Sequence, residues 1–299
     1  MMNSKKQFLG MGAALAANLI FGFSFIFSKL ALSVAEPLVI LAVRFTVAFL
    51  ALNLLLLTGV VKINLKGKPK KKLIAMGVAQ PLLYFILELY GLSLVSSALS
   101  GIIIALVPVG VIVISTFFLN EKPTKLQVIC TFVSILGISA ISIISDDGGK
   151  NRFIGILLLL GAVISAAIFN ILSRSEAERF SPFERTYIMF LIGSVGFNLI
   201  ALCVLRENYF TGIVAAFSEG RFIIAILYLA VISSVAAFML YNYSTSVISA
   251  VRSSSFSNII TVVSVLAGII ILKENFSVAE ILLCIPVILG VWGVNNSSK

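Results

Sequence analysis

The sequence contains no histidine, and only 12 of its 299 residues are acidic. The lack of histidine excludes zinc proteases of the HExxH type, nucleophiles activated by histidine, and haem held by histidine. No GxxxxGK[ST] loop occurs, so we expect no hydrolysis of ATP by this chain. Membrane transferases that bind a diphosphate through a metal need clustered acids, and the adjacent pair Asp146 and Asp147 precedes two glycines, as in a turn. We therefore expect no enzyme, no catalytic residue, no metal and no cofactor.

Charge is also scarce, because only 11% of the residues are charged whereas 60% are hydrophobic. The mean hydropathy is +1.14, and apolar runs long enough to cross a bilayer recur from end to end. The three cysteines lie far apart within apolar runs, which favours packing over a disulfide or a metal site. The composition predicts an all-α integral membrane protein whose main partner is the lipid bilayer.

Ten apolar segments, separated by short polar connections, are candidate transmembrane helices. Each has about the 20 residues that a bilayer core requires. They cover residues 8–28, 37–58, 73–94, 98–119, 126–145, 153–173, 183–205, 222–243, 249–272 and 278–294.

The lysines and arginines predict which side of the membrane each connection faces. Most of them fall on alternate connections, and the densest group is the lysine-rich segment 62–72. Positive connections stay in the cytoplasm, so both the N and C termini are expected there. The net charge of +10 then reflects topology beside anionic lipid, and we do not expect nucleic acid as a partner.

The two halves of the chain resemble each other. An offset of 145 residues places Ser28 on Ser173 and Pro37 on Pro182, and later segments align at an offset of 153. The offset changes near residues 208–220, which we interpret as an inserted surface segment. The sequence therefore predicts two five-helix repeats, at residues 1–147 and 148–299. Because five is odd, the repeats enter the membrane from opposite sides, an arrangement typical of secondary transporters.

Several short motifs resemble one known family. They are Tyr90-Gly91-Leu92, Ser96-Ser97-Ala98, Pro108, Leu119-Asn120-Glu121-Lys122 and the second-half echo Leu272-Lys273-Glu274, together with Arg44 in the second span. With the span number and the duplication, the chain is similar to the ten-helix EamA branch of the drug/metabolite transporter superfamily. One position departs from the pattern, because Thr261 stands where a second proline is expected. The ninth span is therefore expected to be straighter than the fourth.

The resemblance implies a secondary-active carrier in the cell membrane of a bacterium. Such carriers export or exchange small-molecule substrates such as amino acids, other metabolites or drugs by alternating access around a central cavity. The alternative is a passive channel or facilitator for small polar solutes, although repeated filter loops and charged pore rings are absent from the sequence. Substrate, direction of transport, coupling to protons, and the choice between monomer and homodimer stay open.

Polar residues on the faces of the predicted helices are candidates for the lining of that cavity. Their alternative role is to bond to their own helix backbone or to a neighbouring helix. The many phenylalanines are expected mainly to contact lipid. The candidate lining residues are Asn18, Gln80, Tyr84, Glu88, Ser100, Asn170, Ser233, Tyr241, Ser253, Ser257 and Thr261.

Glu88 is the most unusual of these residues, because a carboxylate within a span is costly unless it faces a cavity, water or a cation. Arg44 is expected about 10 Å below the outer end of the second span, and Glu88 about 9 Å below the outer end of the third. We expect the two to form a structural ion pair. The alternatives are that Glu88 carries a coupled proton, or that Arg44 extends to the outer interface.

Overall fold

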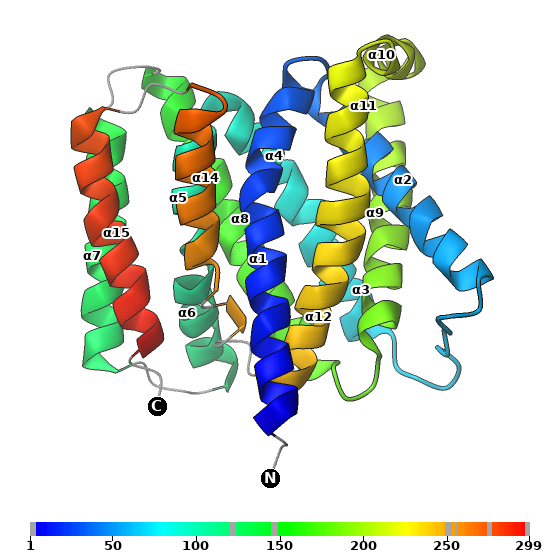
Figure 1. Cartoon of the computed structure of the whole chain (residues 1–299), viewed down its shortest axis with the longest axis horizontal. Helices are drawn as coiled ribbons and strands as arrows, with labels where there is room; N and C mark the ends of the chain where they lie inside the picture. The colour runs from blue at the N-terminus through cyan, green and yellow to red at the C-terminus, as the bar shows by residue number, and fades with distance from the viewer. Residues whose placement is uncertain are drawn as a thin grey trace.

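The computed structural model describes residues 4–119, 124–144, 149–248, 253–254, 256–273 and 277–296, and within these ranges all regular structure is helical. The helices of the first half are α1 (Ser4–Leu32), α2 (Pro37–Leu57), α3 (Lys71–Gly77), η1 (Val78–Leu83), α4 (Tyr84–Leu94), α5 (Ser97–Ile104), α6 (Val107–Leu119) and α7 (Lys125–Ile144). Those of the second half are α8 (Gly149–Ser175), α9 (Pro182–Leu205), α10 (Asn208–Phe217), α11 (Gly220–Leu227), η2 (Tyr228–Ala236), α12 (Ala237–Val247), α14 (Asn258–Ile270) and α15 (Val278–Asn296), as Figure 1 shows.

Seven helical stretches in the described ranges are long and apolar enough to cross a membrane. They correspond to the first four and to the sixth, seventh and eighth of the expected spans. The segments expected as spans five, nine and ten contain α7, α14 and α15. The number of ten transmembrane helices stays a prediction.

Four of the expected spans are interrupted. In the third, Pro81 lacks an N–H group and Gln80 leaves the helical conformation with φ −142° and ψ 114°, so the π-helix η1 joins α3 to α4. The eighth has the π-helix η2 at the corresponding place, without any proline. The fourth is broken by a turn at residues 105–106, between α5 and α6, and the ninth by a turn at residues 256–257 before α14 begins. That the ninth is straighter than the fourth stays a prediction.

The helices of the two halves interleave. α1 packs on α12 while α4 packs on α8, so each of these pairs joins equivalent partners from opposite halves. The pairs α2 with α9, α5 with α14 and α7 with α15 also cross between the halves, and α7 and α15 lie together at one side of the molecule (Figure 1). Two structurally equivalent halves would give this pattern of contacts. The boundary at residue 147 stays a prediction.

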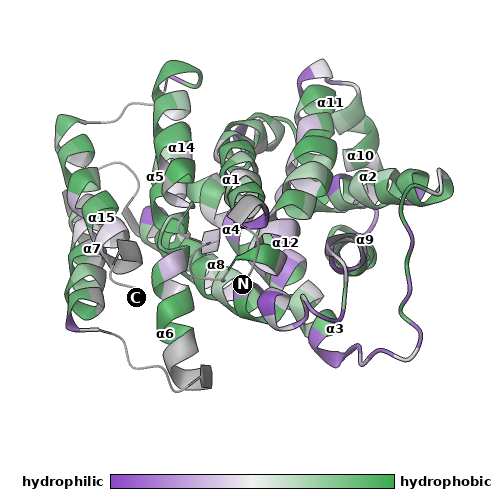
Figure 2. Cartoon of the chain, turned by 60° about the horizontal axis from the view of Figure 1, so that its bottom comes forward, coloured by the Kyte–Doolittle hydropathy of each residue, from purple (hydrophilic) through white to green (hydrophobic). Residues whose placement is uncertain are grey.

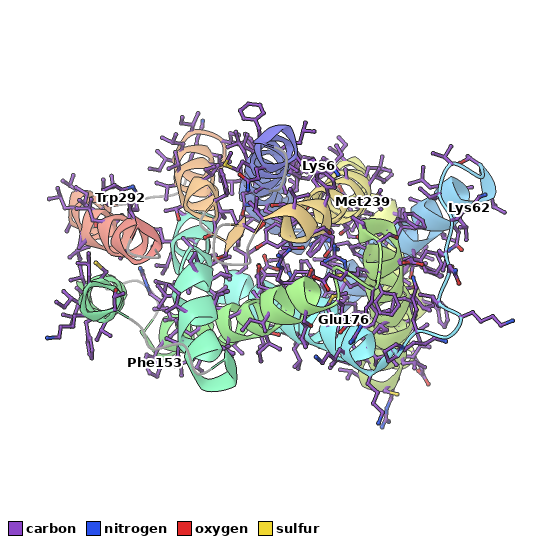
Figure 3. All side chains as sticks on the ribbon, turned by 90° about the horizontal axis from the view of Figure 1, so that it is seen from below. Lys6, Lys62, Phe153, Glu176, Met239 and Trp292 are labelled. Atoms are coloured by element: carbon purple, nitrogen blue, oxygen red, sulfur yellow. The ribbon has the colours of Figure 1, made fainter. Side chains whose placement is uncertain are left out.

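The outside of the bundle is apolar over its middle. Figure 2 shows hydrophobic helix surfaces around the molecule, with hydrophilic residues concentrated in the segment between α2 and α3. Trp292 and Phe153 project outward at the periphery in Figure 3, and both are more than half exposed. In Figure 1, α1 begins and α15 ends at the lower end of the molecule, where the lysine-rich segment also lies. The multi-pass arrangement thus places apolar side chains where lipid would lie.

Candidate functional site

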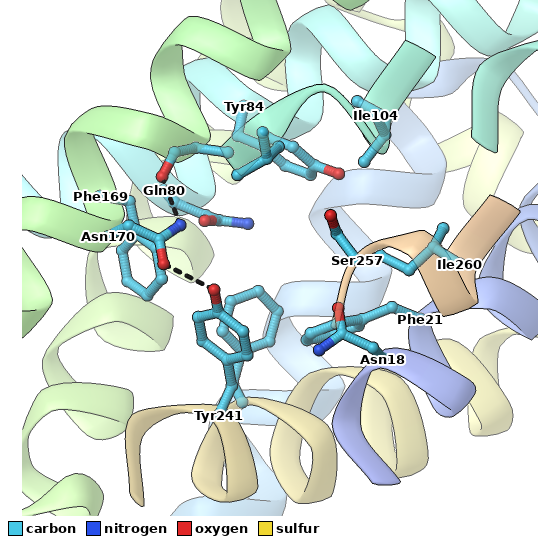
Figure 4. Close-up of a pocket in the computed structure, with 13 residues that line it drawn as sticks. Asn18, Phe21, Gln80, Tyr84, Ile104, Phe169, Asn170, Tyr241, Ser257 and Ile260 are labelled. Atoms are coloured by element: carbon cyan, nitrogen blue, oxygen red, sulfur yellow. Dashed lines mark hydrogen bonds between the residues drawn. The ribbon is translucent and has the colours of Figure 1, made fainter. Parts of the chain in front are cut away.

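A cavity of about 410 Å³ lies at the centre of the bundle. Both halves supply its polar lining, with Asn18, Gln80 and Tyr84 from the first half facing Asn170, Tyr241 and Ser257 from the second (Figure 4). All six were predicted from sequence as candidate lining residues. We name this space the central cavity.

The break in the third span explains how Gln80 reaches the central cavity. Its non-helical backbone interrupts the regular hydrogen bonds around Pro81. The carbonyl of Ala79 accepts a hydrogen bond from the Ser165 hydroxyl of α8 at 2.6 Å, in addition to one from the backbone N–H of Tyr84, so the interrupted segment is tied to α8. The irregular backbone is tolerated because it is buried within protein and beside a cavity.

Hydrogen bonds within the protein hold two amide side chains of the central cavity. Asn170 donates to the carbonyl of Ala166 at 2.8 Å and accepts a hydrogen bond from the Tyr241 hydroxyl at 2.6 Å. Asn18 donates to the carbonyl of Ala14 at 2.7 Å. These bonds fix the side chains before any ligand binds, which reduces the entropy lost on binding.

Aromatic rings form much of the remaining wall. Phe21, Phe169 and Phe238 line the central cavity, and the Phe169 ring stacks on Tyr241 with centroids 6.3 Å apart. Sequence reasoning assigned the phenylalanines mainly to lipid and missed these three. No signal in a single sequence distinguishes a phenylalanine that faces lipid from one that faces a cavity, because both lie on apolar helices. The lining described here carries no charged side chain.

A second space of about 340 Å³ adjoins the central cavity and shares Gln80 and Tyr84 with it. It also contains Arg44, Glu88 and Ser233, so we name it the charged chamber. The sequence predicted all three of these residues as site residues. The two spaces together place a neutral, aromatic compartment next to one that carries both signs of charge.

Arg44 is held by groups other than Glu88. It is 2% exposed, and it donates from Nε to the Ser234 hydroxyl at 3.0 Å and from Nη2 to the Ser233 hydroxyl at 3.4 Å. The guanidinium carbon lies 4.4 Å from the centre of the Phe85 ring, which is the geometry of a cation–π contact. These contacts tie α2 of the first half to η2 of the second.

Glu88 is 3% exposed, and its Oε2 atom has no hydrogen-bond partner. Both charged residues lie in the described ranges, yet no Arg44 nitrogen lies within 4.0 Å of a Glu88 oxygen. The side chains therefore face one chamber without direct contact. Their electrostatic pairing stays a prediction.

Three other predicted residues do not line either space. Ser100 donates to the carbonyl of Ser96 at 2.9 Å, and Thr261 to the carbonyl of Gly101 at 3.4 Å. Ser253 is hydrogen-bonded to the hydroxyl of Ser244. Their hydroxyl groups are thus satisfied by backbone or by a neighbouring segment, which was the alternative role considered for them.

Residues 8–143 and 153–296 each match the model of the EamA-like transporter family. The chain belongs to the EamA-like transporter family. Among the motif residues that suggested this membership, residues 120–122 and Glu274 lie outside the described ranges, as do Asp146 and Asp147.

Relatives of this EamA-like transporter occur in bacteria and archaea. The Bacillus subtilis protein named "Uncharacterized transporter YcxC" is 36% identical over 95% of this chain and 91% of its own length. An "Uncharacterized transporter" from Archaeoglobus fulgidus is 25% identical over 91% of this chain and 93% of its own length. A solved crystal structure with 16% sequence identity covers 97% of this chain and 96% of its own, with a TM-score of 0.68. That last likeness supports the fold.

Proposed function

We propose that this transporter is a secondary-active exporter or exchanger that works by alternating access. The observation that carries the proposal is the central cavity, because its polar lining comes equally from both halves. In carriers built from inverted repeats, the substrate binds near the bilayer midplane between the repeats, and relative movement of the repeats exposes it to either side.

The proposed substrates are small metabolites such as amino acids or drugs. The phenol and amide groups of Tyr84, Asn170 and Tyr241 suit hydrogen bonding to a polar group, while the surrounding rings suit a flat or apolar body. The charged chamber alongside suits a charged head group. We propose that substrate binding spans both spaces.

The proposed location is the bacterial cell membrane, with both termini in the cytoplasm. The lower end of the molecule in Figure 1 carries the lysine-rich segment as well as the start of α1 and the end of α15. Positive segments are retained on the cytoplasmic side. We therefore refer to this lower end as the inner end and to the opposite one as the outer end.

The roles of Arg44 and Glu88 form part of the proposal. We propose that the two balance each other's charge in the charged chamber, since both are buried in it. A Glu88→Gln variant then keeps the dependence of uptake on a proton gradient. Loss of that dependence, with exchange retained, would instead make Glu88 the carrier of a coupled proton.

Counterflow in proteoliposomes tests the function. Purified protein is first screened against metabolites by thermal shift, because a ligand that binds the folded state raises the melting temperature. Liposomes preloaded with an unlabelled hit should then accumulate the labelled compound transiently and with saturation. Uptake that is linear in concentration and shows no counterflow would identify a passive channel and refute the proposal.

A further inference from the structure

A cluster of buried polar residues lies immediately on the inner side of the central cavity. Its members come from the end of α8, the start of α9 and the end of α12, and all are 0% exposed: Ser173, Arg185, Thr186, Asn242 and Thr245. Ser173 follows the cavity residue Asn170 by one turn, and Thr245 follows Tyr241 by one turn. We name these five residues the Arg185 cluster.

Arg185 is the centre of the hydrogen bonds in this cluster. Its Nη1 atom donates to the carbonyl oxygen of Ser173 at 2.8 Å, to the Ser173 hydroxyl at 2.7 Å and to the Thr245 hydroxyl at 3.1 Å. Its Nη2 atom donates to the carbonyl of Asn242 and to the hydroxyl of Ser246. One side chain of α9 thus holds the ends of both α8 and α12.

The side chain of Asn242 closes the network. It accepts a hydrogen bond from the Ser173 hydroxyl at 2.9 Å and donates to the Thr186 hydroxyl at 2.9 Å. Arg174 adds a bond to the carbonyl of Thr245 at 2.9 Å. The three helix ends are therefore joined by side chains that bond to one another as well as to backbone.

The partners of the buried guanidinium are neutral oxygens, with no carboxylate among the bonds of Arg185 in the described ranges. The carbonyls in the last turn of α12 carry the negative end of its helix dipole, which favours a cation there. If the helices separate, the guanidinium loses the partners that α8 and α12 supply, whereas the Asn242 carbonyl keeps its bonds from the hydroxyls of Thr245 and Ser246. Separation therefore requires either entry of water or an exchange of partners.

The equivalent place in the other half has a different chemistry. The two repeat offsets relate Ser173 to Ser28, Arg185 to Ile40 and Asn242 to Leu89. Thr186 and Thr245 correspond to Leu41 and Leu92, and all five counterparts are buried. The Ser28 hydroxyl has no hydrogen-bond partner. Apolar side chains thus replace the hydrogen-bonded network of the Arg185 cluster.

These counterparts lie towards the outer end of the bundle. On α1, Phe25 lines the charged chamber, whereas Lys29, one turn further, lines a wide outer recess of about 1120 Å³. Ser28 lies between them in the sequence and is 0% exposed. Along α1, about one helical turn therefore separates the charged chamber from the outer recess, and we call this turn the outer barrier. About one helical turn also separates the central cavity from the Arg185 cluster.

We propose that the Arg185 cluster is the inner latch of the transporter, which joins α8, α9 and α12 when the inner end is shut and releases them when it opens. The proposal rests on the alternating-access function above. The outer barrier, which has apolar residues at the equivalent positions, opens without breaking such a network. The latch therefore biases the unloaded protein towards the state that is shut on the inner side.

Side-specific labelling of the central cavity tests the latch. Ala166 lines this cavity, so Ala166→Cys supplies a reporter after Cys130, Cys203 and Cys284 are replaced by serine or alanine. A membrane-impermeant maleimide is applied to either face of oriented vesicles. With Arg185→Gln, we expect labelling from the inner face to increase by about fivefold or more and labelling from the outer face to fall.

The matched control is Lys66→Gln, which removes a positive charge from the same end at an exposed side chain. This control should label like the parent protein. If Arg185→Gln does not fold, Ser246→Ala removes only one acceptor and should shift labelling in the same direction by a smaller factor. Labelling within twofold of the control from both faces, in a folded variant, would refute the latch.

The same vesicles separate this proposal from the proposed function. Counterflow by the parent protein tests the carrier function, and the labelling ratio tests the latch. If the parent protein shows counterflow but Arg185→Gln is labelled like the control, the latch is refuted and the carrier function stands. Absence of counterflow with every metabolite hit refutes the carrier function, whatever the labelling ratio.

Discussion

At the scale of single residues, the charged chamber poses a problem of charge balance. Arg44 has hydrogen bonds to two serines and a ring contact, whereas Oε2 of Glu88 has no partner. Removing either charge leaves the other one buried without compensation, while removing both restores neutrality. The free energy of unfolding should therefore depend on the two charges jointly and not on each one separately.

We predict this coupling for a double-mutant cycle of Arg44→Met and Glu88→Gln. Each single variant should lower the free energy of unfolding, and the double variant should lose less than the sum, by about 0.5–3 kcal/mol. Thermal or denaturant unfolding in detergent measures the difference. Strictly additive losses would show that the two charges do not balance each other across the chamber.

Gly101 allows a second prediction at this scale. A Cβ atom there would lie 1.8 Å from the Ser264 hydroxyl oxygen, at the place where α5 packs on α14. Gly101→Ala should therefore force the helices apart and cost about 1–3 kcal/mol of stability. Gly12 has no heavy atom within 4 Å of the same built position, so Gly12→Ala is the control and should leave the melting temperature nearly unchanged. Equal melting temperatures for both variants would contradict the packing described.

The sequence predicts part of the site at residue scale. Gln80, Tyr84 and Glu88 recur every four residues, which predicts one shared helix face. All three meet the two spaces, Tyr84 and Glu88 from α4 and Gln80 from the break in η1. The sequence shows Arg185 only as a positive charge near the start of the seventh expected span. Its partners come from α8, 12 residues away, and from α12, 57 residues away, and such contacts between helices cannot be deduced from the pattern of one chain.

At the scale of elements, α10 is an amphipathic helix with a buried side, an exposed apolar edge and an exposed polar edge. Figure 1 shows it lying across the upper ends of the neighbouring helices. Tyr209 and Ala216 are buried beneath it, whereas Phe210 and Val214 are 65% and 69% exposed. Thr211 is also exposed but lies about 100° around the helix from Phe210. This geometry fits a helix at the membrane surface, with one apolar edge in the headgroup region.

A single tryptophan reporter tests this placement. The chain has one tryptophan, Trp292, so Phe210→Trp in a Trp292→Phe background reports only on α10. Its emission should be quenched by brominated lipid and be little affected by iodide in water. Thr211→Trp in the same background is the control and should show the reverse. Similar quenching at both positions would contradict an interfacial helix.

Elements could be predicted where a run of apolar residues is uninterrupted. The seven candidate spans follow such runs closely, and a proline, Pro81, lies where η1 interrupts the third. The sequence did not reveal η2 or the turn at residues 256–257, because neither contains a proline. Packing against the other half determines the backbone there, as the bonds from Arg44 to Ser233 and Ser234 illustrate.

At the scale of the whole molecule, the orientation in the membrane is the main prediction. Lys72→Cys in a cysteine-free background should react with an impermeant maleimide only from the cytoplasmic face, because positive segments are retained there. Residue Ser33, near the outer recess, is the opposite control, and Ser33→Cys should react only from outside. The reverse pattern would invert the topology and would exchange the inner and outer ends named above.

The interleaving of helices has a consequence for biosynthesis. α1, α2 and α4 have their main partners in α12, α9 and α8, which are synthesised later. Even the segment between α2 and α3 depends on the second half, since the Glu184 carboxylate accepts bonds from the backbone N–H of Asn64 and from Lys68. The helices of the first half therefore enter the bilayer before the surfaces they pack on have been synthesised, and lipid or the insertion machinery must cover them until then. A chain truncated after α7 should accordingly be degraded by membrane proteases instead of persisting as half a transporter.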